Sequence, residues 1–126
     1  MPAKSLLTAA SLCLALSVPA TALAHAEHGK PQYGGVVAEA GEAQFEIVPH
    51  DGKVVVHASH HGAPVSMTGA TGKLTVLEGS KKSEIALKAA GDNRLEGSGA
   101  VSGGAKLLLN VQMPGGKTLQ ARSLAR

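Results

Sequence analysis

Histidines are the residues of this chain with the clearest capacity for chemistry, and they are unevenly distributed. All six fall between His25 and His61, and the rest of the chain after His61 contains none. Imidazole nitrogen is a favoured ligand of late first-row transition metals, among which Cu(II) binds most tightly in the divalent series. The clustering therefore predicts a site for Cu(II) or Zn(II), with Ni(II) or Co(II) as further candidates, in the leading part of the chain.

The densest cluster is the stretch "HASHH", which closes a strand-like run and is followed by Gly62-Ala63-Pro64. Two arrangements of its rings are open. If the strand continues unbroken, His57 and His61 share one face and His60 points the other way. If the chain turns after the run, the adjacent His60 and His61 can bind one ion together.

A β-hairpin is predicted around Asp51-Gly52, because an Asp-Gly pair between β-rich runs is typical of a two-residue type I′ turn. This loop sets a register in which Glu46 faces His57 on the solvent side of the ribbon. The pair is a candidate source of one oxygen and one nitrogen ligand, or else a surface pair worth ~0.2–1 kcal/mol. The opposite face is apolar and is expected to form the core: Phe45, Ile47, Val54, Val56 and Ala58.

The N-terminus carries the features of a cleavable secretory signal peptide over residues 1–24. Lys4 precedes an apolar run, and Ala22-Leu23-Ala24 matches a typical cleavage signature. Cleavage after Ala24 would make His25 the first residue of an exported, periplasmic chain without a membrane span. Its free amine and ring, together with His28, could then chelate an ion from a flexible arm spanning residues 25–32.

Residues 33–126 are expected to form a single all-β domain of about seven strands. Short apolar runs alternate with turn sequences such as "PHDG", "EGSKK" and "AAGDN", at the spacing of an antiparallel sandwich or barrel. A second hairpin is predicted to turn at Pro114-Gly115-Gly116, with Met113 pointing inward.

Composition argues against several functional classes. Cys13 lies in the leader, so the mature chain offers no thiol, and the full chain has only one Phe, one Tyr and no Trp. Its charges are interspersed, and we therefore expect no nucleic-acid binding. Motifs of hydrolases and metalloproteases are absent from the sequence. We expect neither catalysis nor an organic cofactor.

Four stretches resemble a family of small exported bacterial proteins and the N-terminal module of periplasmic adaptor subunits of heavy-metal efflux pumps of the RND type. They are "QYGGVVAEAGEAQFEIV", "DGKVVVHASHHGAPVSMTGATGKLTVL", "AAGDNRLEGSG" and "AKLLLNVQMPGGKTLQARSLAR". The resemblance implies an immunoglobulin-like antiparallel β-sandwich and a periplasmic role in handling transition metals. The chain stops at Arg126 without an adaptor's further domains, so a free-standing accessory protein is expected.

Two functions remain in view. The first is a metal-binding buffer or chaperone that works with an efflux adaptor, using His25, His28, Glu46, His57, His60 and His61. The second is a non-catalytic interaction module whose histidines are incidental or respond to pH near an unperturbed pKa of ~6.5.

Overall fold

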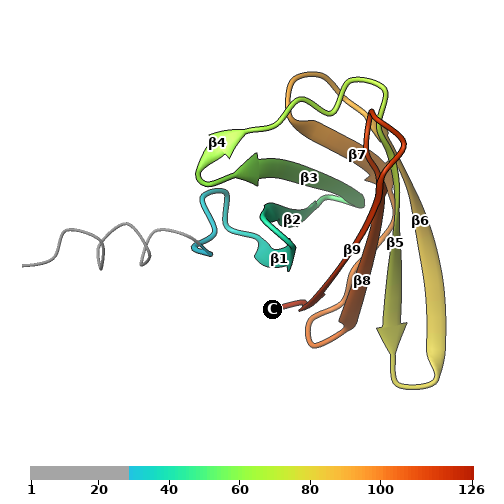
Figure 1. Ribbon diagram of the computed structural model, residues 1–126. Helices are drawn as coiled ribbons and strands as arrows, with labels where there is room; N and C mark the ends of the chain where they lie inside the picture. Colours follow the sequence, from blue (N-terminus) through green and yellow to red (C-terminus); the bar gives the residue numbers. More distant parts are fainter. Residues whose placement is uncertain (1–28) are drawn as a thin grey trace, which may run out of the picture.

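The computed structural model describes residues 29–126, so the predicted leader, its cleavage site, His25 and His28 lie outside the described residues. Within this part the chain consists of β-strands and contains no helix (Figure 1). The predicted all-β antiparallel class is therefore confirmed. The strands are β1 (Val36–Ala40), β2 (Ala43–His50), β3 (Lys53–His60), β4 (Ala63–Pro64), β5 (Thr71–Glu78), β6 (Lys81–Ala89), β7 (Arg94–Ser98), β8 (Lys106–Gln112) and β9 (Thr118–Leu124).

All strands belong to one continuous sheet in the order β1-β2-β3-β7-β6-β5-β8-β9, with β4 paired to β3. The sheet curls until its two edges meet, and the Ser123 hydroxyl of β9 donates a hydrogen bond of 3.0 Å to the Val37 carbonyl of β1. The result is nearly a barrel (Figure 1). The immunoglobulin-like sandwich stays a prediction, and the strands that the sequence did not reveal are the short β4 and β7.

The β2–β3 hairpin has the predicted register. Asp51 and Gly52 both have positive φ, 49° and 74°, as a type I′ turn requires. Glu46 accordingly lies opposite His57. The five residues expected in the core are all buried: Phe45, Ile47, Val54, Val56 and Ala58.

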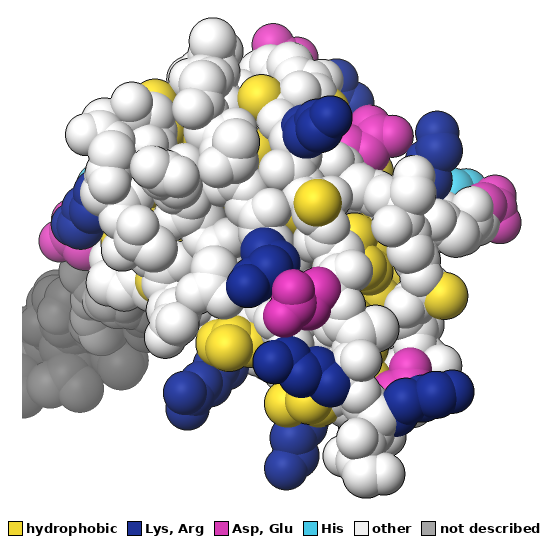
Figure 2. Space-filling view, turned by 90° about the vertical axis from the view of Figure 1, so that its right-hand side faces the viewer, with side chains coloured by type: hydrophobic (Ala, Val, Ile, Leu, Met, Phe, Trp, Pro, Cys, Tyr) yellow, Lys and Arg dark blue, Asp and Glu magenta, His cyan; other side chains and the backbone are white. Residues whose placement is uncertain are grey.

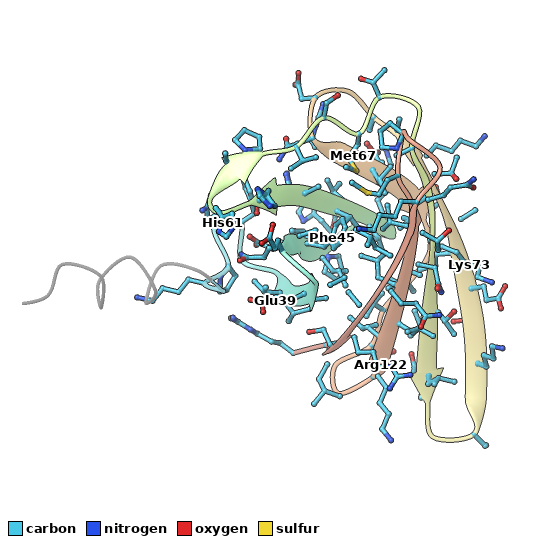
Figure 3. The ribbon with its side chains drawn as sticks, viewed as in Figure 1. Glu39, Phe45, His61, Met67, Lys73 and Arg122 are labelled. Atoms are coloured by element: carbon cyan, nitrogen blue, oxygen red, sulfur yellow. The ribbon has the colours of Figure 1, made fainter. Side chains whose placement is uncertain are left out.

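The interior is filled by aliphatic side chains from every long strand, with Phe45 as its only aromatic ring (Figure 3). Met67 also lies in this core and is fully buried. Met113, after β8, packs against the core from its edge, as predicted for the second hairpin. The core thus gives the curled sheet a rigid base for the loops at its ends.

The outer face of β5 and β6 is polar, and Figure 2 shows basic and acidic side chains interspersed over it. Glu84 lies 3.8 Å from the Lys73 ammonium and 3.7 Å from that of Lys82. Exposed pairs of this kind contribute at most about 1 kcal/mol each. This face therefore keeps the sheet solvated and adds little to its stability.

The backbones of β6 and β7 approach closely where the sheet turns its corner, and Gly97 permits this approach. A Cβ added at this glycine would lie 2.2 Å from the Ala86 carbonyl oxygen and 2.9 Å from Cγ2 of Ile85. Glycine inside a strand often marks such a corner, where two backbones approach closely. The bend brings the β1-β2-β3-β7 half of the sheet over the β6-β5-β8-β9 half.

Gly97→Ala should destabilise the fold by about 1–3 kcal/mol, because the methyl group meets backbone that cannot move without opening the corner. Urea unfolding monitored by circular dichroism would measure this. Gly115→Ala is the matched control, since nothing lies within 4 Å of its added Cβ. Equal unfolding midpoints for the two variants would contradict this account of the bend.

Candidate metal site

The chain turns directly after β3, and this settles which histidines meet. His61 and Gly62 form the two-residue loop between β3 and β4, with φ of 50° and 82°. Because the strand does not run on through His61, the unbroken-strand arrangement does not arise. Instead the rings of His60 and His61 lie edge to face, with centroids 4.3 Å apart and planes at 79°.

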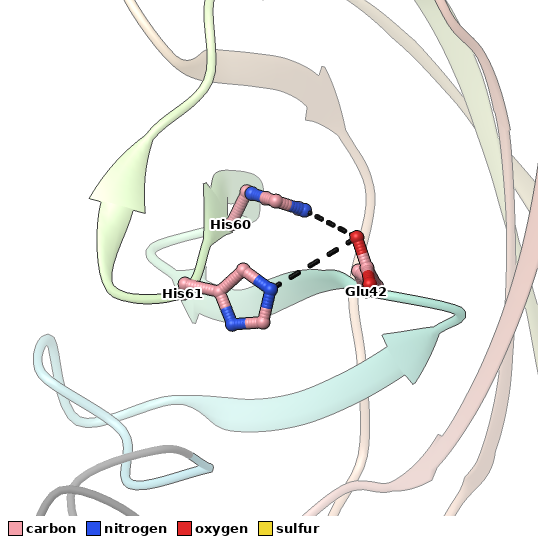
Figure 4. A network of polar contacts seen from close by, with 3 residues as sticks. All are labelled: Glu42, His60 and His61. Atoms are coloured by element: carbon pink, nitrogen blue, oxygen red, sulfur yellow. Dashed lines mark hydrogen bonds and ion pairs between the residues drawn. The ribbon is translucent and has the colours of Figure 1, made fainter.

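Glu42 joins these two rings from the neighbouring loop. Gly41 and Glu42 connect β1 to β2, and Ala43 pairs with His60, so Glu42 lies beside the β3–β4 turn. Its Oε2 is 2.9 Å from Nε2 of His60 and 3.9 Å from Nε2 of His61 (Figure 4). All three side chains are exposed, and one ligand atom from each lies within 4.8 Å of the others.

This geometry suits a transition-metal ion. Zinc bonds to imidazole nitrogen and carboxylate oxygen measure about 2.0–2.2 Å, so ligand atoms this close need only modest side-chain rotations to share one ion. Two nitrogens and one oxygen would leave a further coordination position for water or an outside ligand. That is the donor set of an open site.

The two neighbouring imidazoles favour the ionised form of Glu42, which is the form that binds a metal ion. The hydrogen bond from His60 lowers the pKa of Glu42, and the charges of His60 and His61 lower it further. An ionised carboxylate can only accept, so Nε2 of His60 donates the hydrogen bond in the metal-free state. An ion binding at Nε2 must displace that proton, which couples binding to pH.

Glu46 lies on the predicted face of the hairpin but is not in solvent, which corrects the expectation from the sequence. The segment before β1 folds over it, and its side chain is only 5% exposed. Its carboxylate accepts the backbone N–H groups of Gln32 at 2.6 Å, Tyr33 at 2.8 Å and Gly35 at 2.9 Å. This carboxylate is therefore committed to anchoring the chain that precedes the sheet.

His57 belongs to the same anchor. Its ring stacks on Tyr33 with centroids 3.8 Å apart and planes at 11°. Partial burial lowers the pKa of His57, against the opposing charge of Glu46 and with a smaller contribution from Arg94. The structure thus places Glu46 and His57 together, as predicted, but apart from the Glu42, His60 and His61 cluster.

Neither His50 nor the described part of the predicted N-terminal arm belongs to the cluster. His50 lies at the β2–β3 turn, 3.0 Å from the Asp51 carboxylate and largely exposed. Residues 29–32 of the predicted flexible arm are tied to β2, since the N–H of Gly29 donates to Oε1 of Gln44 at 3.0 Å. His25 and His28 lie outside the described residues.

The sequence contained a signal for Glu42 that the sequence analysis did not use. The register set by Asp51-Gly52 was used to pair Glu46 with His57 and was not extended to the end of the strand. Extending it through Gln44–Ser59 and Ala43–His60 brings Glu42 to the level of His61. The turn itself was one of the two predicted arrangements, and the structure has it at His61 and Gly62.

Glu46→Gln should destabilise the protein by about 1.5–3 kcal/mol, because at least one buried backbone N–H loses a charged acceptor. Urea unfolding would measure the loss, and amide exchange at Tyr33 and Gly35 should accelerate. Glu78→Gln, at an exposed position on β5, serves as the control. Wild-type stability in the Glu46 variant would show that these hydrogen bonds do not hold the segment.

His57 should make the fold less stable in acid. The pKa of His57 is lowered from 6.5, so the folded state favours the neutral ring. The resulting contribution to stability is fully present above pH 6.5, and it is lost as the pH falls through the pKa of the folded state. In His57→Phe an aromatic ring still stacks on Tyr33, but the ring no longer takes up a proton. The variant should lose less unfolding free energy than wild type between about pH 7.5 and pH 5; parallel losses would contradict this.

Comparisons with known proteins add no assignment. No protein-family model, curated protein or solved structure matches this chain. Within residues 29–126 there is also no helix long and apolar enough to cross a membrane. The geometry of the site itself therefore carries the functional argument.

Proposed function

We propose that the protein binds a late first-row transition-metal ion, Cu(II) or Zn(II), through Glu42, His60 and His61. The observation that carries the proposal is the convergence of these three side chains within 4.8 Å, from two tight turns on adjacent strand ends. Ni(II) and Co(II) are further candidates, because they accept the same nitrogen and oxygen ligands. The proposed role is non-catalytic.

The exposure of the cluster favours reversible binding of the ion. Structural zinc sites are closed by four protein ligands, whereas this cluster supplies three exposed ones and leaves a coordination position open. An incoming partner could use that position to deliver or remove the ion. Buffering or transfer of metal therefore fits the site better than permanent structural binding.

The N-terminal arm is a proposed source of further ligands. The described chain begins at Gly29, whose N–H donates to the side chain of Gln44 on β2, two residues after Glu42. His28 directly precedes this anchored residue, and His25 follows the predicted cleavage site. We infer that one or both can supply nitrogen to the same ion, while Glu46 and His57 fix the point from which the arm departs.

The resemblance to efflux-adaptor modules gives the proposal its cellular setting. In this view the protein is exported, loses its leader after Ala24 and serves in the periplasm as an accessory to a heavy-metal efflux system, with the adaptor as a partner. The two halves of the curled sheet would correspond to the facing layers of an immunoglobulin-like sandwich, joined at the β6–β7 corner.

One observation favours the alternative of a protein-interaction module. Tyr33 is 55% exposed although it stacks on His57, and an exposed aromatic ring beside a titratable one is suited to a pH-responsive contact. In that function the Glu42, His60 and His61 cluster would serve only as a surface ion-pair network. Metal titration separates the two functions.

The exported chain beginning at His25 should bind one Cu(II) or Zn(II) ion per molecule in calorimetry. Glu42→Gln, or His60→Ala with His61→Ala, should weaken binding by about tenfold or more, equivalent to about 1.4 kcal/mol. The matched control is His50→Ala with Asp51→Asn. This removes an exposed pair of similar length, 3.0 Å, that lacks a second imidazole.

Equal affinities for wild type and the cluster variants would refute the site. Loss of binding only on His25→Ala with His28→Ala would assign the ion to the arm alone. No saturable binding of either ion, with the fold intact by circular dichroism, would favour the interaction module.

A further inference from the structure

A large apolar groove opens where the two edges of the sheet meet, away from the metal cluster. It has a volume of about 820 Å³ and lies between β1, β8 and β9. Glu42, His60 and His61 are not among its lining residues, and Figure 3 shows Arg122, which lines it, below and to the right of His61. Its apolar walls come from Val36, Val37, Leu77, Leu107, Leu108 and Leu124.

The groove lies over the outside of the core. Leu108 and Leu124, which line it, are accessible, whereas the neighbouring Leu107 belongs to the core and is only 2% exposed. A volume of this size falls within the range of about 300–1,000 Å³ that is typical of small-molecule sites. An alkyl chain could therefore lie along the accessible apolar side chains.

The charged side chains that line the groove are all basic. Lys106, Arg122 and Arg126 are its charged residues, and no acidic side chain is among those that line it. All three are exposed, and none forms an ion pair with another residue of the described range 29–126. Cations without partners beside apolar walls are complementary to a ligand with an anionic head and an apolar tail.

We propose that this groove binds one molecule of a long-chain acyl carboxylate, such as a free fatty acid. The tail lies against Leu108 and Leu124, and the carboxylate pairs with Arg122 and Lys106. A guanidinium binds a carboxylate through two parallel hydrogen bonds, which fixes the orientation of the head. The binding is non-covalent and independent of the proposed metal site.

An extended peptide fits the groove less well. A strand added to the open edge of β1 or β9 would have to displace the hydrogen bond from the Ser123 hydroxyl to the Val37 carbonyl, which joins these edges at 3.0 Å. Peptides added in this way run along a strand edge, whereas this groove is lined by residues of four strands, β1, β5, β8 and β9. The lining therefore favours a small amphiphile over an added strand.

Titration of the leaderless protein with sodium laurate, below its micelle concentration, tests the proposal by calorimetry. We expect one saturable site, with the methyl signals of Leu108 and Leu124 shifting in NMR spectra. Arg122→Gln with Lys106→Gln should weaken binding by about tenfold. The control is Lys81→Gln with Lys88→Gln, which removes two exposed cations from β6.

Dodecyltrimethylammonium, with the same tail and a cationic head, should bind much more weakly than laurate, and butyrate should not bind. Equal binding of the two twelve-carbon amphiphiles, or equal affinity of the Arg122 and control variants, would overturn the proposal. The proposal would also fail if laurate did not bind and the protein formed a concentration-dependent dimer that Leu108→Asn disrupted. The groove would then be an interface between two copies of the chain. Saturable binding of an acidic peptide without laurate binding would overturn it as well.

Discussion

The cross-strand register of the β2–β3 hairpin is the constraint on which both the fold and the candidate site depend. Two residues with positive φ, Asp51 and Gly52, fix it at one end. From there every pair follows, down to Ala43 opposite His60 at the other end. A shift of one residue would turn Phe45 and Ile47 outward and separate Glu42 from the histidines. The buried face therefore enforces the geometry of the exposed cluster.

Glu46 on this hairpin and Glu42 just before it show how the surroundings of a carboxylate decide its role. Glu46 is covered by the segment before β1 and accepts three backbone N–H groups, so its oxygens are already used. Glu42 lies in an exposed loop, where its contacts are imidazole rings that can rotate and exchange a proton for a metal ion. The first carboxylate holds the start of the domain in place, and the second is available to a ligand.

The sequence predicted the parts of the structure that local signals determine. The Asp-Gly turn, the inward face of β2 and β3, and the second hairpin near Met113 follow from turn chemistry and alternation. It did not reveal β7, because Leu95 is the only large apolar residue in that strand. The sequence also contained no sign that the segment before β1 folds over Glu46, since nothing in "HGKPQYGG" indicates which part of the sheet this segment contacts.

The sequence predicted that histidine and glutamate would form the candidate site, but it identified only some of the residues that meet there. His60 and His61 were placed correctly in the version of the prediction in which the chain turns after them. Glu46 and His57 were correctly paired, but their pairing serves the anchor of residues 32–35. Glu42 was missed because the register was not followed to the end of the strand, and cross-strand neighbours are invisible to linear motifs.

The most direct test of the central claim is an NMR titration of the histidine ring nitrogens with Zn(II). We expect the signals of His60 and His61 to change together and reach their end point at one equivalent, while that of His50 does not move. Rings that respond independently, or a first equivalent taken up with His60 and His61 unchanged, would contradict it.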